Sequence, residues 1–267
     1  MATLHQFTYG FVTLALSYGL SVLGSFMGLV AAARAQAAME HRVRWLVLAS
    51  WAIGGTGIWV MHFMAMIGFS VVGSEVRYDI ATTVASWLIA VVMVGIGLFI
   101  VGYGRPSVAK VLLGGPLAGL GVAAMHYTGM GAMRVGGDVH YDQTLVIVSV
   151  AIAVIAATAA LAFTVLVRKP RTVMISALIM GIAVSGMHYT GMYALRIHLA
   201  TQAPGVSGVQ PIVFLLPIMV FVILVLMALC YALLVHPVTS DSEIAAQMRA
   251  RLTRRPAGDG PGYPPHL

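Results

Sequence analysis

The sequence has few charged residues and a single cysteine, and each shortage excludes whole classes of protein. Charged residues make up 9% of the 267 positions, whereas soluble domains have about 25%. Hydrophobic residues make up 60%, so the chain lacks the polar surface that a dissolved protein needs. The lone Cys230 excludes an internal disulfide, a thiolate zinc site and an iron–sulfur cluster. These shortages indicate an integral membrane protein.

Several common functional motifs are also absent from the sequence. It contains neither a glycine-rich phosphate loop nor a Gly-x-Ser-x-Gly nucleophile elbow. Despite the net charge of +7, the basic residues form no stripe that would bind nucleic acid, so no nucleic-acid partner is expected. The long apolar runs contain no Asp or Glu and no activated nucleophile. We therefore expect that the protein is not an enzyme.

Seven apolar runs are long enough to cross a membrane as helices, which takes about 20 residues each. They are too long and too continuously apolar for the strands of a membrane β-barrel. The sequence thus predicts an all-α membrane protein with seven transmembrane helices. The predicted spans are Thr8–Ala33, Trp45–Phe69, Ile80–Val101, Val108–Met133, Leu145–Val167, Val173–Ile197 and Ile212–Val235.

The basic residues are distributed unevenly between the two sets of connecting segments. Twelve Lys and Arg residues follow the first, third, fifth and seventh spans, and three lie on the other side. Because cytoplasmic loops carry the excess of Lys and Arg, the N-terminus is predicted outside and the C-terminus in the cytoplasm. The bilayer is then the first partner, with most of the positive charge against its anionic inner leaflet.

The chain divides into a membrane domain, residues 1–236, and a tail, residues 237–267. In the tail, Ser240-Asp241-Ser242-Glu243 is typical of a helix-capping box. It predicts a short interfacial helix, followed from Pro256 by a disordered Pro- and Gly-rich end. We expect no catalytic output domain in a tail of this length.

Three alternate runs contain the same short motif at nearly equal intervals. The motifs are Met61-His62-Phe63-Met64-Ala65-Met66, Met125-His126-Tyr127-Thr128-Gly129-Met130 and Met187-His188-Tyr189-Thr190-Gly191-Met192. Two crossings restore the chain direction, so these intervals predict parallel two-helix repeats around an axis along the membrane normal. The three histidines then lie at the same depth, in the outer half of the membrane.

A methionine follows each histidine by four residues, on the same helical face. Helical side chains lean toward the N-terminus, which brings the thioether to the level of the imidazole. The small residue before each of these methionines allows neighbouring helices to approach closely. We predict one site near the outer face with six candidate ligands: His62, His126, His188, Met66, Met130 and Met192.

This donor set favours copper among the common biological metals. Mg²⁺ and Ca²⁺ prefer oxygen ligands, and a non-haem iron triad needs a carboxylate, which the spans lack. Thioether and imidazole together suit copper, especially Cu(I). An all-histidine zinc site stays open, and haem fits three equivalent histidines less well. A metal-free alternative also stays open, in which each histidine only hydrogen-bonds a neighbouring helix.

Other motif residues are candidates for a supporting role. The methionines directly before the histidines are either additional ligands or packing residues. The tyrosines and threonines after the histidines either orient the imidazoles or act as interfacial aromatics and backbone-bonded hydroxyls. These candidates are Met61, Met125, Met187, Tyr127, Tyr189, Thr128 and Thr190.

Over residues 5–236, the three motifs resemble the bacterial MHYT family of integral membrane sensors. The resemblance implies the bacterial inner membrane, copper near the outer face, and sensing of oxygen, carbon monoxide or nitric oxide. Many members also carry a cytoplasmic cyclic-dinucleotide or transcriptional output domain, whereas only about thirty residues follow the last span here. If the chain signals, we therefore expect it to do so through a separate cytoplasmic signalling partner or by movements of its own helices. In the first motif, Phe63 and Met64 replace the tyrosine and threonine.

Three functions remain open from the sequence. The leading one is a copper-containing membrane sensor that signals through helix movements. Copper transport or handling is the second, although residues on the inner side of the histidines are Gly, Ala, Ile and Val and offer no polar path. A metal-free structural or accessory bundle is the third.

Overall fold

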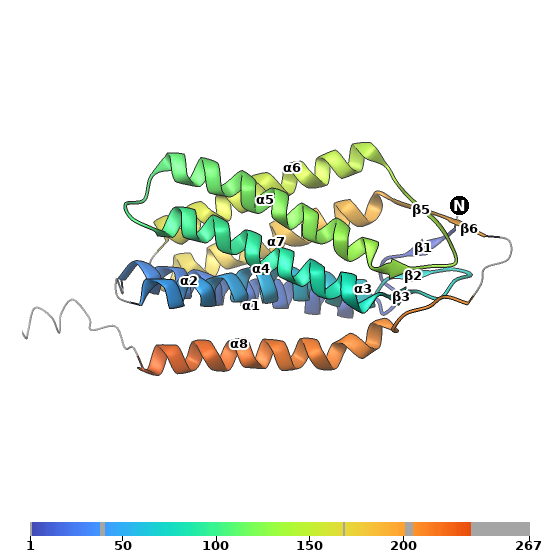
Figure 1. Ribbon diagram of the computed structural model, residues 1–267, viewed down its shortest axis with the longest axis horizontal. Helices are drawn as coiled ribbons and strands as arrows, with labels where there is room; N and C mark the ends of the chain where they lie inside the picture. Colours follow the sequence, from blue (N-terminus) through green and yellow to red (C-terminus); the bar gives the residue numbers. More distant parts are fainter. Residues whose placement is uncertain (1, 38–40, 168, 201–204, 236–267) are drawn as a thin grey trace, which may run out of the picture. The chain divides into compact units, whose positions relative to one another are not determined.

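The computed structural model describes residues 2–37, 41–167, 169–200 and 205–235. Within these ranges, seven helical segments are long and apolar enough to cross a membrane (Figure 1). This confirms the predicted all-α membrane fold of seven spanning helices. The predicted tail lies outside the described residues, and the predicted orientation stays a prediction. The segments are α1 (Phe11–Ala37), α2–η1–α3 (Arg42–Ile67), α4 (Ile80–Gly102), α5 (Val108–Gly131), α6 (Gln143–Leu166), α7 (Pro170–Tyr193) and η2–α8 (Pro211–Val235).

Short polar side chains determine where several helices begin. The Asp79 carboxylate accepts a hydrogen bond from the Thr82 backbone N–H at the start of α4, and Asp142 caps α6 in the same way. Ser107 caps α5, while α7 begins at Pro170, whose ring fixes a helical φ and whose missing N–H is not needed there. Polar residues in the loops and Pro170 thus determine where these helices begin. The observed starts lie within a few residues of the predicted ones.

The first six crossings pack in a closed ring in the order of the sequence. Each crossing contacts the one before it and the one after it, and α7 closes the ring by packing against α1. The three segments that carry the histidine motifs, α3, α5 and α7, therefore alternate around the ring. Their motif faces can all point to the centre, which is how the fold brings residues more than sixty positions apart to one place.

The second crossing is not a uniform α-helix. It comprises α2 (Arg42–Ser50), a π-helical stretch η1 (Trp51–Val60) and α3 (Met61–Ile67). In its most apolar 18-residue window 83% of the residues are buried, compared with 44% in α5 and 39% in α7. Apolar periodicity did not predict this π-helix, which ends directly before the first histidine motif. The π-helix is rare, and where single π-helical turns interrupt α-helices they are frequently found at functional sites.

Three antiparallel β-ribbons lie at one end of the helices, here called the ribbon end (Figure 1). Each motif-bearing helix ends one residue after the last methionine of its motif, and the chain then enters a strand. The predicted span Val173–Ile197 was therefore too long, because the helix ends at Tyr193 and the next residues pair as a strand. The ribbons are β1 (Leu4–His5) with β2 (Ser70–Val71), β3 (Arg77–Tyr78) with β4 (Met133–Arg134), and β5 (Gly137–Tyr141) with β6 (Leu195–Leu199).

Candidate metal centre

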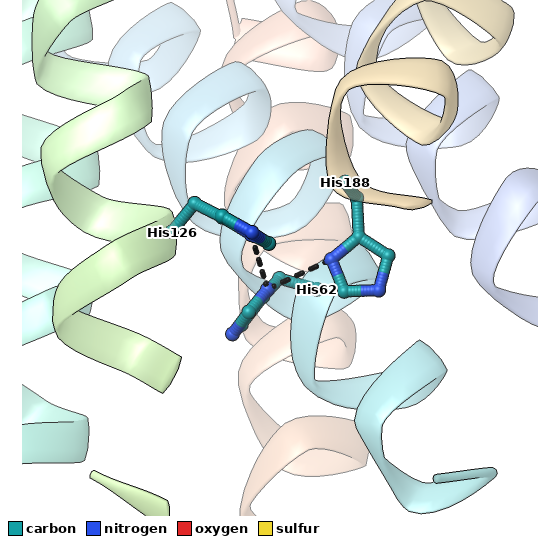
Figure 2. A group of neighbouring side chains, drawn as sticks. All are labelled: His62, His126 and His188. Carbon is teal, nitrogen blue, oxygen red and sulfur yellow. Dashed lines mark hydrogen bonds between the residues drawn. The ribbon is translucent and has the colours of Figure 1, made fainter. Parts of the chain in front are cut away.

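The three motif histidines meet in the interior of the helix ring, close to its ribbon end. His62 on α3, His126 on α5 and His188 on α7 are 0%, 1% and 2% exposed. Figure 2 shows the three side chains converging from three separate helices. The Nδ1 atom of His62 lies 3.0 Å from Nδ1 of His188 and 3.2 Å from Nδ1 of His126. We call these three residues the histidine cluster.

The imidazole rings of the cluster are arranged with approximate threefold symmetry. Their centroids are separated by 4.9, 5.0 and 5.2 Å, and each pair of rings is within 10° of perpendicular. One ligand nitrogen from each ring lies within 4.8 Å of the other two. The three repeats thus present the same atom to a common point, as expected if that point is where the cluster acts.

The nitrogens of the cluster fit a metal cation better than they fit one another. A neutral imidazole has one N–H and one lone pair, so Nδ1 of His62 cannot form good hydrogen bonds to two further Nδ1 atoms at once. Three lone pairs that converge are instead satisfied by one cation. Metal–nitrogen bonds of about 2.0–2.1 Å separate neighbouring ligand nitrogens by about 3.3–3.6 Å, slightly more than the 3.0 and 3.2 Å seen here.

The distal nitrogens of two histidines lie against glycines of the next motif-bearing helix. A Cβ atom added to Gly129 would be 2.6 Å from Nε2 of His62, and one added to Gly191 would be 2.2 Å from Nε2 of His126. Both Nε2 atoms are buried and have no hydrogen-bond partner among the described residues. The small motif residues were expected to let neighbouring helices approach each other. At these two glycines, the helix backbone approaches an imidazole ring of the neighbouring motif-bearing helix. No sequence pattern indicated which side chain each glycine would contact.

All seven methionines of the motifs are buried. Met66, Met130 and Met192 are at most 1% exposed, and the methionines that precede the histidines are at most 2% exposed. Among the latter, Met187 also lines an apolar cavity beside the cluster. Burial at matched positions agrees with the predicted thioether ligands but is equally expected of packing residues, so sulfur ligation stays a prediction.

Two hydroxyl groups of the second and third motifs form hydrogen bonds to residues outside the cluster. The Tyr127 hydroxyl pairs with Ser149 on α6 at 2.6 Å, and Thr190 donates to the Gly186 carbonyl at 2.7 Å. Thr128 is half-buried. The tyrosines contact the histidines through their rings, since Tyr127 packs edge-on against His126 and Tyr189 against His188, both at 4.9 Å. Any orienting effect of these tyrosines on the cluster is thus one of ring packing.

The charged groups near the ribbon end lie in the loops and caps. Hydrogen bonds from the Thr82 side chain and backbone N–H lower the pKa of Asp79, with a smaller contribution from Arg134. Burial raises the pKa of Tyr78, so its hydroxyl stays protonated. Within the described residues, the group that could hold a metal consists of the three histidines and includes no carboxylate. This composition does not suit Mg²⁺ or Ca²⁺.

Comparison with known proteins identifies the family. The model of the MHYT family, described as a bacterial signalling protein N-terminal repeat, matches residues 55–114, 119–177 and 181–246, together more than half of the chain. The chain belongs to the MHYT family. Each match begins a few residues before a histidine of the cluster, which confirms both the resemblance and the threefold repeat. No solved structure matches the chain.

Three curated relatives show the context in which such MHYT repeats occur. The bifunctional diguanylate cyclase/cyclic di-GMP phosphodiesterase MucR of Pseudomonas aeruginosa is 38% identical over 200 residues, 73% of this chain and 29% of that protein. The cyclic di-GMP phosphodiesterase NbdA of the same species is 33% identical over 207 residues, 75% and 26% respectively. The signaling protein YkoW of Bacillus subtilis is 33% identical over 168 residues, 58% and 21% respectively. The chain thus spans less than a third of these relatives.

Proposed function

We propose that this MHYT protein is a membrane sensor that binds copper at the histidine cluster. The observation that carries the proposal is the convergence of three buried imidazoles, with Nδ1 atoms 3.0 and 3.2 Å apart, in a membrane protein of a signalling family. Copper supplies reversible binding of a small ligand or a change of oxidation state. It is favoured over zinc because thioethers at matched positions accompany the imidazoles.

The buried side chains of the three motifs would hold the metal. His62, His126 and His188 would provide the nitrogen ligands, and we propose Met66, Met130 and Met192 as the sulfur ligands. Their burial keeps the imidazoles neutral, which is the form that binds metals. The sensed molecule is proposed to be oxygen, carbon monoxide or nitric oxide. We propose that the protein lies in the bacterial inner membrane with the ribbon end outside.

The output is proposed to be a separate cytoplasmic protein rather than an enzymatic activity of this chain. Two relatives of the chain are named as enzymes that make or degrade cyclic di-GMP. An enzyme of that class is therefore the proposed partner. A change at the cluster would have to favour one of two helix arrangements, because a ligand shifts an equilibrium only by its differential affinity for the two states.

Metal analysis of the purified protein and matched variants tests the proposal. We expect about one copper per chain in the wild type and none in the triple variant His62→Ala/His126→Ala/His188→Ala. The double variant His140→Ala/His198→Ala is the control, because it removes two exposed histidines from the β5–β6 ribbon. Copper retained by the triple variant would refute the site. Copper uptake into vesicles without any response to a gas would favour transport instead.

A further inference from the structure

An apolar cavity of about 50 Å³ lies inside the helix ring. Its walls come from α1, η1, α4, α5, α6 and α7 and consist almost entirely of Ala, Val, Ile, Leu and Met side chains. Four alanines of α6 form one wall: Ala153, Ala156, Ala157 and Ala160. The predicted spans gave no sign of this cavity, because it depends on which helix faces oppose one another.

The cavity lies directly beside the histidine cluster, on the side away from the ribbon end. Ile58, Val122 and Val184 line it, and each precedes a histidine of the cluster by four residues. Helical side chains cover the turn on the N-terminal side of their own Cα, so each imidazole leans toward this apolar ring of three residues. The apolar ring is therefore both the boundary of the cavity and the floor of the cluster. Met187, the neighbour of His188, also reaches the cavity.

The chemistry of the walls determines what the cavity can hold. A buried water needs 2–4 polar partners, and cavities lined by aliphatic groups stay dry even when they are large enough for water. The Thr164 hydroxyl, one of the few polar groups at the walls, already donates to the Leu161 carbonyl at 2.7 Å. A volume of about 50 Å³ exceeds the 10–15 Å³ that one water requires. It suits an uncharged molecule of a few heavy atoms.

One wall of the cavity is thin and belongs to a helix that faces outward. On α6, Ile147 and Ile155 are 68% and 70% exposed, as expected of side chains that contact lipid. On the same helix the cavity-lining Ala156, Ala157 and Ala160 are only half-buried. Because alanine has the shortest apolar side chain, little separates the cavity from the bilayer along this helix.

We infer that this cavity is a binding site for a small uncharged apolar molecule, which enters from the bilayer past α6 and reaches the histidine cluster through the apolar ring. The inference rests on the proposed function in one respect, namely that the cluster is where the molecule acts. The inference gives the small molecule and the metal different positions relative to the cluster. The molecule arrives from the hydrocarbon of the membrane, and the metal is held by imidazoles on the ribbon side of the cavity.

Xenon is the probe that tests the cavity without involving the metal. We expect one xenon atom between α5, α6 and α7 in xenon-pressurised crystals of the wild type, with or without copper. Ala160→Leu should abolish it by filling the cavity, whereas Ala159→Leu, on the exposed face of the same helix, should leave it. Val184→Ala enlarges the cavity and should raise xenon occupancy. Xenon absent from the wild type, or unchanged in both Ala160→Leu and Val184→Ala, would overturn the inference.

Carbon monoxide tests the route to the cluster in copper-loaded protein. We expect Ala160→Leu to slow the appearance of the infrared band of bound carbon monoxide by about tenfold, at unchanged copper content, and Ala159→Leu to have no effect. Equal rates in the two variants would refute the route while leaving the copper site intact. A wild type that binds xenon in the cavity but holds no copper would refute the proposed function and leave the cavity assignment standing.

Discussion

Two of the motif-bearing crossings, α5 and α7, are continuous α-helices with the full Met-His-Tyr-Thr-Gly-Met motif, whereas the second crossing differs in three ways. Its motif has Phe63, Met64 and Ala65 in place of Tyr, Thr and Gly. A ten-residue π-helix precedes the motif. The fraction of buried residues in the most apolar part of this crossing is about twice that in α5 and α7. Its histidine nevertheless occupies the same place, since Nδ1 of His62 lies within 3.2 Å of both other Nδ1 atoms.

The difference shows which positions the cluster constrains. In α5, Tyr127 is held by a hydrogen bond to Ser149, whereas in α3 the ring of Phe63 is surrounded by Trp59, Tyr78 and Phe214 at centroid distances of 4.9–5.9 Å. An aromatic shell thus replaces a hydrogen-bonded one around the first motif. The histidine is present in all three repeats. The residue after it differs, being a hydrogen-bonded tyrosine in α5 and a phenylalanine among aromatic rings in α3.

The largest effect is expected from truncating the histidines one at a time. We expect His62→Ala to lower copper affinity more than His126→Ala or His188→Ala, because Nδ1 of His62 makes both of the short contacts in the cluster, at 3.0 and 3.2 Å. The loss should exceed the 10–100-fold that is typical of substitutions at residues that only orient a metal ligand. Competition with a Cu(I) chelator measures it, with His140→Ala as the control. Equal losses in the three variants would mean that His62 has no special place in the cluster.

The second-largest effect is expected from adding a methyl group to the glycines of the second and third motifs, where the first motif has Ala65. Gly191→Ala and Gly129→Ala would place Cβ 2.2 and 2.6 Å from the facing imidazoles, so the rings must shift. We expect a 10–100-fold loss of copper affinity and a destabilisation of about 1–3 kcal/mol by overpacking, larger for Gly191→Ala. Chelator competition and thermal denaturation measure these effects.

Other positions provide matched controls for the glycine variants. A methyl group on Gly131 or Gly186 would meet nothing within 4 Å, so both alanine variants should bind copper normally. Ala65→Gly restores the full motif glycine to the first repeat and should leave copper binding unchanged, with a loss of about 1 kcal/mol from helix propensity. If Gly131→Ala weakened binding as much as Gly129→Ala, contact with the imidazole would not be the cause.

Exchanging the tyrosine and phenylalanine tests the two kinds of support. Phe63→Tyr introduces a hydroxyl at a side chain that is 2% exposed among aromatic rings, and we expect a loss of about 1–3 kcal/mol. Tyr127→Phe removes only the bond to Ser149, whose hydroxyl still donates to Val146, and should cost about 0.5–1.5 kcal/mol. Thermal denaturation measures both. The opposite order would show that the first motif tolerates hydroxyls as well as the others.

The smallest effect is expected from the cap of α4, and it depends on pH. Because the folded protein lowers the pKa of Asp79, the ionised cap stabilises the fold above the pKa of the unfolded chain. This contribution is lost as the pH falls through the lower folded-state pKa. Asp79→Asn should therefore melt below the wild type at pH 7, and the two melting temperatures should converge as the pH falls through the lowered folded-state pKa of Asp79. A constant difference would assign the effect to hydrogen bonding alone.

The sequence predicted the fold and the position of the cluster because both depend on simple periodicities. Long apolar runs gave seven spans whose ends differ from the structure by a few residues, and recurrence of the motif placed His62, His126 and His188 together. Features that depend on the opposing surface were not predictable. They include the contact of each glycine with an imidazole, the cavity beside Val184, and the end of α7 at Tyr193, where strand pairing competes with an apolar sequence that would otherwise stay helical.

The β-ribbons restrict the kinds of movement that the helices can make. Each ribbon begins two or three residues after a motif-bearing helix ends, and the longest pairs five residues of β6, which follows α7, with the strand that connects toward α6. Sliding α7 along its own axis would break this ladder of backbone hydrogen bonds, whereas tilting about the ribbon end preserves it. A change of bundle shape that preserves this ladder would therefore tilt α7 about the ribbon end and move its opposite end furthest.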